Sequence, residues 1–511
     1  MQQLAEISGV RGVARGGVLH IVLGLIFAAG LALQLPFALN HDAAWHFETS
    51  FRLLHGARFG DGVYDVNPPM SAWLFLLPAA ICDATGASPT LVFKLFTFAM
   101  MLGAIAATVR LLPIAAPEID DPLVALAALA IALVLVPAYD FGQREHLVSA
   151  LTLPYVILAA ARARGATFPA VAAVGIGFAA ALGIGVKPYF LMLPVCIEAW
   201  LFVIAKRRVI RPELVTMAVT LLIYLVAVQL FAPDYLWRVV PDAMIAYSAF
   251  QVGWPDLARD FAIRLGPYLI GVGILAVALR GRLSLLLQAC MAAALGFLFA
   301  AVLQRKGWAY QTYPVAMYCL FFAGVAFSVP ALRKNALRSV AWAAAILAFA
   351  GGVSIVSFVR DGIAPDGTTA RVRALTALFR EYGSVYAFIT SPRDIHPAVL
   401  ESHARWTSAS GVLVFLPAML DTPGNAAVHA VGTRRDLETV AELYARHPRI
   451  IVVDAETGKL GIRQPDFDYL RFFARYPGFA AFMRNYVEQE RIGDFRVFRY
   501  APPASSRAIS D

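Results

Sequence analysis

Charged residues are scarce in this chain. Asp, Glu, Lys and Arg make up 15% of its 511 residues and 59% are hydrophobic, with a mean hydropathy of +0.67. Soluble domains carry about 25% charged residues, so the composition excludes an ordinary soluble protein. The sequence also lacks internal repeats and low-complexity segments.

Cysteine is rare as well. The chain has four cysteines, and all of them lie in apolar segments. They are interpreted as small buried hydrophobic residues, which excludes a disulfide framework. These residues are Cys82, Cys196, Cys290 and Cys319.

Apolar runs long enough to cross a bilayer recur from residue 17 to about residue 359. The first run follows Arg11 and Arg15, is too long for a signal-peptide core and has no convincing cleavage site before Asn40, so it is predicted to be a signal anchor. Pro68–Cys82 is short and begins with proline, which fits an interfacial or re-entrant helix. The predicted spans, about eleven in all, are Gly17–Leu39, Ser88–Leu112, Pro122–Ala138, Leu147–Ala163, Pro169–Gly185, Pro188–Ala205, Glu213–Phe231, Ile263–Leu279, Leu283–Leu303, Trp308–Ser328 and Val340–Phe358.

The net charge of +9 would suggest a nucleic-acid partner in a soluble protein. Here most basic residues of the membrane region cluster in short loops, so they are interpreted as topology signals and no nucleic-acid partner is expected. With the N-terminus in the cytoplasm, five basic groups face the cytoplasm, although the acidic loop Arg110–Asp121 fits poorly there. The five groups are Arg11/Arg15, Arg162/Arg164, Lys206/Arg207/Arg208/Arg211, Arg280/Arg282 and Arg333/Lys334/Arg338.

This orientation predicts a multi-pass protein of a bacterial inner (plasma) membrane. The chain after Arg360 would lie outside, in the periplasm or extracellular space. The predicted external loops are Asn40–Ala87, Tyr139–His146, Val186–Lys187, Ala232–Ala262 and Gln304–Gly307.

The composition changes after the last span. Residues 1–360 are predicted to form a polytopic α-helical membrane domain, and residues 361–511 a soluble external α/β domain with a frayed tail after Pro502. Runs of β-branched and aromatic residues predict strands, and amphipathic runs predict helices. The predicted strands are Ser384–Ile389, Gly411–Phe415, Arg449–Val453 and Phe495–Tyr500, and the predicted helices are Thr369–Tyr382, Asp436–His447 and Asp466–Glu488.

The first predicted external loop begins with an acidic, His-bearing stretch, Asn40–Glu48. A carboxylate just outside a membrane helix is costly unless it is solvated, paired or functional. Asp42 is therefore the best candidate for a catalytic base, and the alternative is that it caps the helix that follows. Asp42 and His46 are four residues apart, which places them near each other on a helix that is expected to end near His55 and Gly56.

The second chemistry-bearing segment is Tyr139–His146. It holds Asp140, Arg144 and His146, more polar side chains than a simple turn requires. Two structural alternatives remain: Asp140 caps the next helix, or Glu145 pairs with Arg144. A functional role is favoured for the segment as a whole.

Adjacent cations and amphipathic aromatic residues characterise the third segment, Gln304–Pro314. This pattern suits a phosphate headgroup at the interface, and the alternative is an aromatic belt with anchoring cations. Four basic residues in predicted external loops oppose the positive-inside trend and suggest an anion site, although contact with lipid headgroups would also explain each one. They are Arg144, Lys187, Arg305 and Lys306.

The order of these features resembles the GT-C superfamily of membrane glycosyltransferases, which includes protein O-mannosyltransferases and lipid A aminoarabinose transferases. The resemblance rests on Asp42, on Leu53–Gly56 and Asp65–Pro69, on Lys306–Tyr310, and on the predicted external C-terminal domain. Many relatives have Asp-Glu at the start of the loop, whereas Ala43 follows Asp42 here. Glu48 and Asp140 are the alternative second carboxylates.

The resemblance implies transfer of a sugar, with inversion, from a polyprenyl-phosphate donor to a glycan, lipid or protein acceptor at the external face. Asp42 would take the acceptor proton, and the four basic residues would stabilise the departing phosphate. The loops near the site contain no Asp-x-Asp pair, so no metal or other cofactor is expected. The residues expected to contact substrate are His46, Asn67, His146, Trp308 and Tyr310.

A transporter or flippase of lipid-linked sugars is the alternative function. It would predict paired halves with Gly- or Pro-broken helices and ionisable residues at mid-membrane. The notable charges here lie at the predicted external ends of spans, which favours an interfacial enzyme. A structural membrane protein with a sensory domain would leave Tyr139–His146 unexplained.

Overall fold

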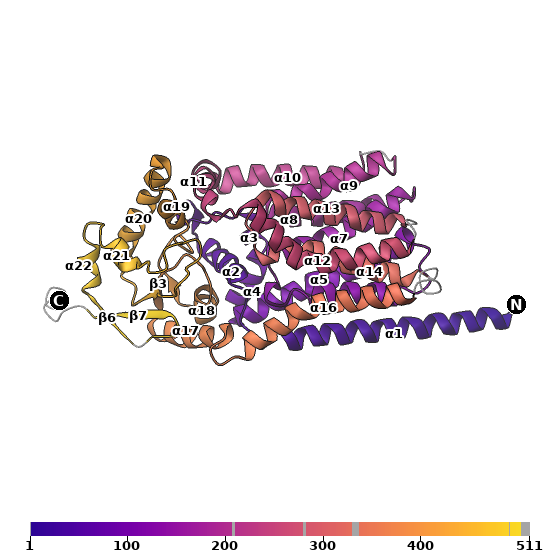
Figure 1. Ribbon diagram of the computed structural model, residues 1–511, viewed down its shortest axis with the longest axis horizontal. Helices are drawn as coiled ribbons and strands as arrows, with labels where there is room; N and C mark the ends of the chain where they lie inside the picture. Colours follow the sequence, from indigo (N-terminus) through magenta and orange to yellow (C-terminus); the bar gives the residue numbers. More distant parts are fainter. Residues whose placement is uncertain (1, 207–209, 280–282, 330–336, 490, 502–511) are drawn as a thin grey trace. The chain divides into compact units, whose positions relative to one another are not determined.

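The computed structural model describes residues 2–206, 210–279, 283–329, 337–489 and 491–501 (Figure 1). Some topology residues (Arg207, Arg208, Arg280, Arg282, Arg333 and Lys334) and the tail after Pro502 lie outside these ranges. The chain forms two compact units. The first contains Met1–Phe37, Lys94–Tyr224 and Val252–Val359, and the second contains Ala38–Phe93, Leu225–Gln251 and Arg360–Asp511.

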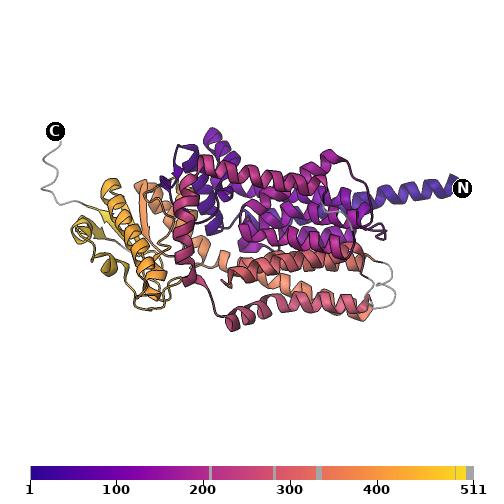
Figure 2. The same ribbon diagram turned by 90° about the horizontal axis from the view of Figure 1, so that it is seen from above.

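The first unit is helical, as predicted, and its helices run alongside one another (Figure 2). Among the described residues, 7 helices are long and apolar enough to cross a membrane, and each predicted span coincides with a helix. The helices, including three that cross a unit boundary, are α1 (Gln2–Gln34), α5 (Pro89–Ala115), α6 (Leu123–Val134), η1 (Ala138–Asp140), α7 (Arg144–Ala163), α8 (Ala170–Gly185), η2 (Pro188–Leu191), α9 (Met192–Val203), α10 (Pro212–Phe231), α12 (Trp254–Ala278), α13 (Leu285–Gln304), η5 (Ala309–Thr312), α14 (Tyr313–Ser328) and α16 (Leu337–Ile363).

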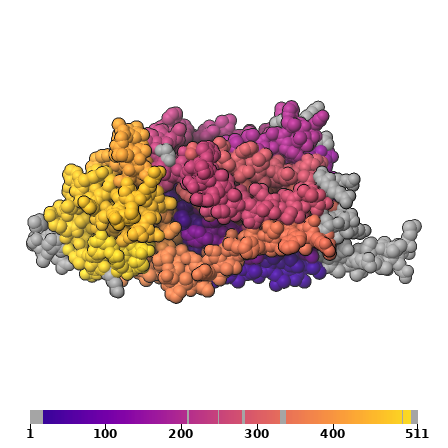
Figure 3. Space-filling view, viewed as in Figure 1, coloured from indigo at the N-terminus to yellow at the C-terminus, as the bar shows by residue number. Residues whose placement is uncertain are grey.

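Helix α7 lies inside the first unit, where it packs against α8 and α13. Small residues allow close helix contacts: a Cβ added to Gly296 on α13 would lie 2.8 Å from the Met192 carbonyl oxygen. By contrast, α1 and α16 expose large apolar side chains such as Leu25 and Phe349, and parts of both helices are visible at the surface in Figure 3. An apolar outer surface of this kind suits contact with lipid.

The second unit combines short helices with a five-stranded sheet of order β4-β3-β5-β7-β6. Strand β3 pairs in parallel with β4 and β5, and β7 pairs antiparallel with β5 and β6. The elements are α2 (His41–Leu54), β1 (Arg58–Phe59), β2 (Gly62–Val63), α3 (Met70–Trp73), α4 (Leu76–Thr85), η3 (Tyr235–Val239), α11 (Val240–Ala246), η4 (Tyr247–Phe250), α17 (Thr368–Tyr382), β3 (Ser384–Phe388), α18 (Ile395–Ser402), β4 (Arg405–Trp406), α19 (Leu416–Asp421), α20 (Ala426–Arg446), β5 (Ile450–Asp454), α21 (Tyr469–Phe473), α22 (Phe479–Met483), β6 (Tyr486–Glu488) and β7 (Phe495–Tyr500).

Both faces of the sheet are buried, which explains why β3 and β5 are continuous apolar runs. Val385 and Ile450 pack on one face with Leu375 and Phe379 of α17. On the other face, Tyr386 packs within a cluster that includes residues of α20, α21 and α22. Helices therefore cover the sheet on both sides.

Two of the predicted elements are wrong. Gly411–Phe415 is not a strand: Gly411 packs on the indole of Trp45, and the run leads into α19 with Pro417 in its first turn. Asp466–Glu488 is not one helix, because Gly478 has a φ of +84° and separates α21 from α22. The strand runs near β3, β5 and β7 are confirmed, and the helix predicted at Asp436 begins ten residues earlier, at Ala426.

Candidate functional site

The predicted site residues are divided between the two units. The second unit holds Asp42, His46, Glu48 and Asn67, and the first holds Asp140, Arg144, His146, Lys187, Arg305, Lys306, Trp308 and Tyr310.

Asp42 lies in the first turn of α2 and is not the capping residue. The N-cap is Asn40, whose Oδ1 accepts hydrogen bonds from the Asp42 N–H (3.0 Å) and the Ala43 N–H (3.4 Å). The Asp42 carboxylate lies 3.6 Å from His41 Nε2, and both side chains are partly exposed (22% and 23%). A carboxylate in the first turn of a helix is also favoured by the helix dipole.

A buried carboxylate, Asp65, organises the neighbouring residues. It accepts hydrogen bonds from Trp45 Nε1 (2.9 Å) and from the backbone N–H (2.9 Å) and side-chain amide (2.8 Å) of Asn67. Asp65 was not predicted as a site residue, although an Asp two residues before an N–H donor is a familiar turn signal. Asn67 therefore has a positioning contact with Asp65 in addition to its predicted substrate role.

His46 is buried, with 2% of its surface exposed. Within the described ranges neither ring nitrogen has a hydrogen-bond partner, and Nδ1 lies 3.6 Å from Asp65 Oδ2. Buried polar atoms in native structures normally have partners. His46 is therefore a position on α2 with spare hydrogen-bonding capacity for a ligand.

Glu48 contacts the C-terminal part of the second unit. Its Oε2 lies 2.9 Å from Nδ1 of His396 on α18, and His396 Nε2 donates to the Gly411 carbonyl oxygen (2.8 Å). Trp45 packs against the same imidazole. Glu48 thus joins α2 to α18, a partnership that no local sequence signal indicates.

In the first unit, Glu145 forms a buried ion pair with Lys187. The Nζ–Oε1 distance is 2.7 Å, and the residues are 8% and 1% exposed for Lys187 and Glu145. Lys187 Nζ also lies 5.4 Å from the centroid of the Tyr310 ring. Glu145, which the sequence left open as a partner of Arg144, therefore has a longer-range partner in Lys187.

The segment before α7 is held by its own side chains. Gln143, and not Asp140, is the N-cap of α7. His146 Nδ1 accepts from the Gly142 N–H (2.9 Å), so Nε2 carries the proton and donates to the Leu133 carbonyl oxygen (2.8 Å). His146 has both ring nitrogens engaged by the backbone, which gives it a positioning contact besides its predicted role.

The cations of the third segment stack on aromatic rings. Arg305 ends α13 with a φ of +50°, and its guanidinium lies 4.5 Å from the Trp254 ring. It also donates to the Val252 carbonyl oxygen (3.2 Å). Lys306 Nζ lies 4.4 Å from the Trp308 ring. This arrangement is compatible with a bound phosphate and also with interfacial anchoring.

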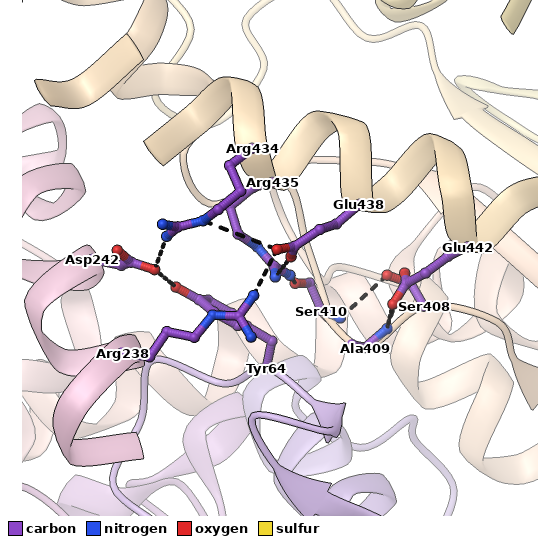
Figure 4. Close-up of polar contacts among 10 residues, drawn as sticks. All are labelled: Tyr64, Arg238, Asp242, Ser408, Ala409, Ser410, Arg434, Arg435, Glu438 and Glu442. Atoms are coloured by element: carbon purple, nitrogen blue, oxygen red, sulfur yellow. Dashed lines mark hydrogen bonds and ion pairs between the residues drawn. The ribbon is translucent and has the colours of Figure 1, made fainter. Parts of the chain in front are cut away.

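A second polar cluster surrounds Tyr64 (Figure 4). The Tyr64 hydroxyl donates to Asp242 (2.9 Å), and the Arg435 guanidinium lies 3.6 Å above its ring. Burial, and then the Asp242 carboxylate, raises the pKa of the Tyr64 phenol. Arg434 pairs with Asp242 (2.5 Å), and Arg238 pairs with Glu438 on α20 (2.6 Å). These ion pairs and the Tyr64 hydrogen bond hold three chain segments together.

No group of three or more His, Cys, Asp or Glu side chains in the described part of the chain could hold a metal ion.

A comparison with solved structures finds the fold of this chain elsewhere. The crystal structure of ArnT from Cupriavidus metallidurans bound to undecaprenyl phosphate matches with a TM-score of 0.59 and 12% sequence identity, covering 94% of this chain and 98% of that one. No protein-family model matches the sequence, and a search of curated proteins finds no match. The likeness confirms the predicted fold class, a polytopic helical membrane protein with a C-terminal α/β part, and shows that the chain shares the fold of ArnT.

Proposed function

We propose that this protein is an integral-membrane glycosyltransferase that moves a sugar from a polyprenyl-phosphate donor to an acceptor at the external membrane face. The observation that carries the proposal is the fold shared over 94% of the chain with ArnT, a protein crystallised with undecaprenyl phosphate. The partly exposed carboxylate of Asp42 at the start of α2 supports it.

In the proposed reaction, Asp42 accepts the proton of an acceptor hydroxyl as its oxygen attacks the anomeric carbon of the donor. The bond between that carbon and the phosphate oxygen breaks, and the lipid phosphate leaves with the electron pair. A phosphate is a good leaving group, so no general acid is required. One displacement inverts the anomeric centre.

Positive charge is proposed to stabilise the departing phosphate. Lys187 already pairs with Glu145 at 2.7 Å. Arg305 and Lys306 lie over aromatic rings and are the preferred candidates, with Arg144 and Lys187 as further ones. The site would lie at the bilayer surface, where the lipid donor enters from the membrane.

Purified protein in nanodiscs, given labelled polyprenyl-phosphate sugars and a cell-envelope extract, tests the proposal. We expect release of polyprenyl phosphate together with a labelled product. The proposal is wrong if no donor is cleaved with any sugar offered and the intact donor moves between the leaflets. The protein would then be a flippase. Mass spectrometry of envelope glycans from a deletion strain would then identify the acceptor.

The proposed orientation has a separate test. Gly424 is exposed, and an added side chain would meet no atom within 4 Å. A Gly424→Cys variant should react with a membrane-impermeant thiol reagent in cells whose outer membrane, where there is one, is permeabilised. Labelling only after lysis of the inner membrane would reverse the orientation and remove the proposed external site.

A further inference from the structure

A cavity of about 200 Å³ lies at one edge of the sheet in the second unit. Arg393 and Asp394 reach it from the chain that follows β3, and Asp454 and Glu456 reach it from the end of β5. Asp494 precedes β7, which runs antiparallel to β5 and so begins at the same edge. The catalytic proposal uses none of these residues.

The strand order places this cavity where a ligand site is expected. Strand β4 lies on one side of β3 and strand β5 on the other, and both run parallel to β3. The direction in which successive strands are added to the sheet therefore reverses between β3 and β5. Open α/β sheets bind ligands outside the carboxyl ends of the strands at such a switch point.

Asp394, one of the residues that line the cavity, has a buried carboxylate oxygen without a hydrogen-bond partner among the described residues. The residue is 2% exposed, and its Oδ2 accepts from Arg371 Nε (2.6 Å). Its Oδ1 has no hydrogen-bond partner among the described residues. Its backbone φ is +56°, a conformation that non-glycine residues rarely adopt and that is often retained at functional sites. A buried carboxylate oxygen without a partner is a ready acceptor for a ligand donor.

The charges of the cavity define the chemistry of that ligand. Its two guanidinium groups are already paired, Arg371 with Asp394 (2.6 Å) and Arg393 with Glu456 (3.9 Å). Asp454 and Asp494 leave the lining negative overall. Hydroxyl and ammonium donors suit such a site, whereas a phosphate or carboxylate would be repelled. The volume is below the roughly 300–1,000 Å³ of drug-sized pockets, which suits a single small polar ring.

The cavity is also electrostatically close to the proposed base. Burial lowers the pKa of His41, and the neighbouring charges of Asp42, Arg393 and Asp394 act on it as well. His41 Nε2 lies 3.6 Å from Asp42 Oδ1. The charges of Asp42 and of two cavity residues, Arg393 and Asp394, therefore act on the same imidazole.

We propose that this cavity binds one ring of a neutral or amino-bearing saccharide. Its assignment as part of the acceptor rests on the proposed glycosyltransferase function, and saccharide binding itself does not. Asp394, Asp454 and Asp494 accept hydrogen bonds from the ring substituents.

Saturation-transfer NMR on the full-length protein in nanodiscs tests the binding, because no sugar-based detergent then competes. The probes are glucose, glucosamine and glucuronic acid. We expect signals from glucosamine or glucose and none from glucuronic acid. Asp394→Asn and Asp494→Asn should each weaken binding about tenfold or more, the loss expected for one hydrogen bond to a charged group. Asp494 is exposed, so its variant is expected to fold even where Asp394→Asn does not.

Glu381→Gln is the matched control, because Glu381 is an exposed carboxylate at the opposite end of α17 from Arg371. Equal binding of glucuronic acid, or unchanged binding by Asp494→Asn, would overturn the inference. Donor cleavage is measured on the same samples. Cleavage without saccharide binding defeats only the saccharide site, and binding without cleavage defeats only the glycosyltransferase proposal.

Discussion

The two units each bury a glutamate against a basic partner, but the partners differ in chemistry. In the first unit Glu145 faces Lys187, and in the second Glu48 faces His396. The His396 Nε2–H already donates to Gly411, so Nδ1 is the ring nitrogen that faces the Glu48 carboxyl. A histidine ring nitrogen can act as donor or acceptor, whereas a lysine ammonium only donates and keeps its charge. The lysine pair therefore depends on its counter-charge more strongly than the histidine pair does.

Asp42 differs from both buried glutamates because it is partly exposed and is proposed to work in catalysis. Asp42→Asn removes the base with little change of shape, so transfer should fall by roughly 10²–10⁴-fold while the thermal unfolding midpoint stays near that of the parent. Steady-state transfer and a thermal melt measure both. Turnover near the parent level would remove Asp42 from the mechanism.

Breaking the lysine pair should give the next largest effect. Glu145→Gln removes the carboxylate that Lys187 Nζ contacts at 2.7 Å in a buried ion pair, and the loss should be about 3–5 kcal/mol of folding free energy. Chemical denaturation of the purified variant measures it. A Glu145→Gln, Lys187→Met double variant should recover much of the loss, and no recovery would show that the pair is not the cause.

The stacked cations give a smaller effect on activity. Arg305→Ala or Lys306→Ala should remove about 1.5–3 kcal/mol of phosphate binding, which is roughly tenfold to a hundredfold weaker use of the donor. Initial rates at varied donor concentration report the change as a raised KM for the donor. Unchanged kinetic constants for the donor in both variants would indicate that Arg305 and Lys306 only anchor the protein at the membrane interface. The phosphate-binding role would then be assigned to Arg144 and Lys187.

The smallest effect is expected for the matching substitution in the second unit. Glu48→Gln leaves His396 able to stay neutral and to accept a hydrogen bond from the new amide, so the loss should be about 1 kcal/mol. The same denaturation assay allows direct comparison with Glu145→Gln. Equal losses in the two variants would contradict the distinction between the pairs.

Much of the fold follows from the sequence because hydrophobic runs are local signals. The predicted spans and the buried runs of β3 and β5 coincide with elements of the structure. Predictions are wrong where contacts between residues far apart in the sequence determine the local conformation. Gly411–Phe415 has the composition of a strand, but Gly411 is held against Trp45, 366 positions earlier in the chain.

The candidate site was predictable only in part for the same reason. Position after the first apolar run was enough to select Asp42, although the sequence left open whether it caps α2, a role that Asn40 fills. His396 contacts Glu48 across 348 residues, and Asp394 is the N-cap residue of α18 in a segment with an unremarkable local sequence. Contacts between residues so far apart in the sequence produce no periodic pattern from which they could be predicted.

Gly411 also limits how this protein can diversify. A single added methyl group there would lie 2.8 Å from the indole of Trp45, and the Gly411 carbonyl is the acceptor for His396. Even an alanine would therefore push on the ring that bonds Asp65 and on the imidazole that meets Glu48. Homologues that keep Trp45 and His396 should keep glycine at this position, whereas a lineage that loses the indole becomes free to replace it.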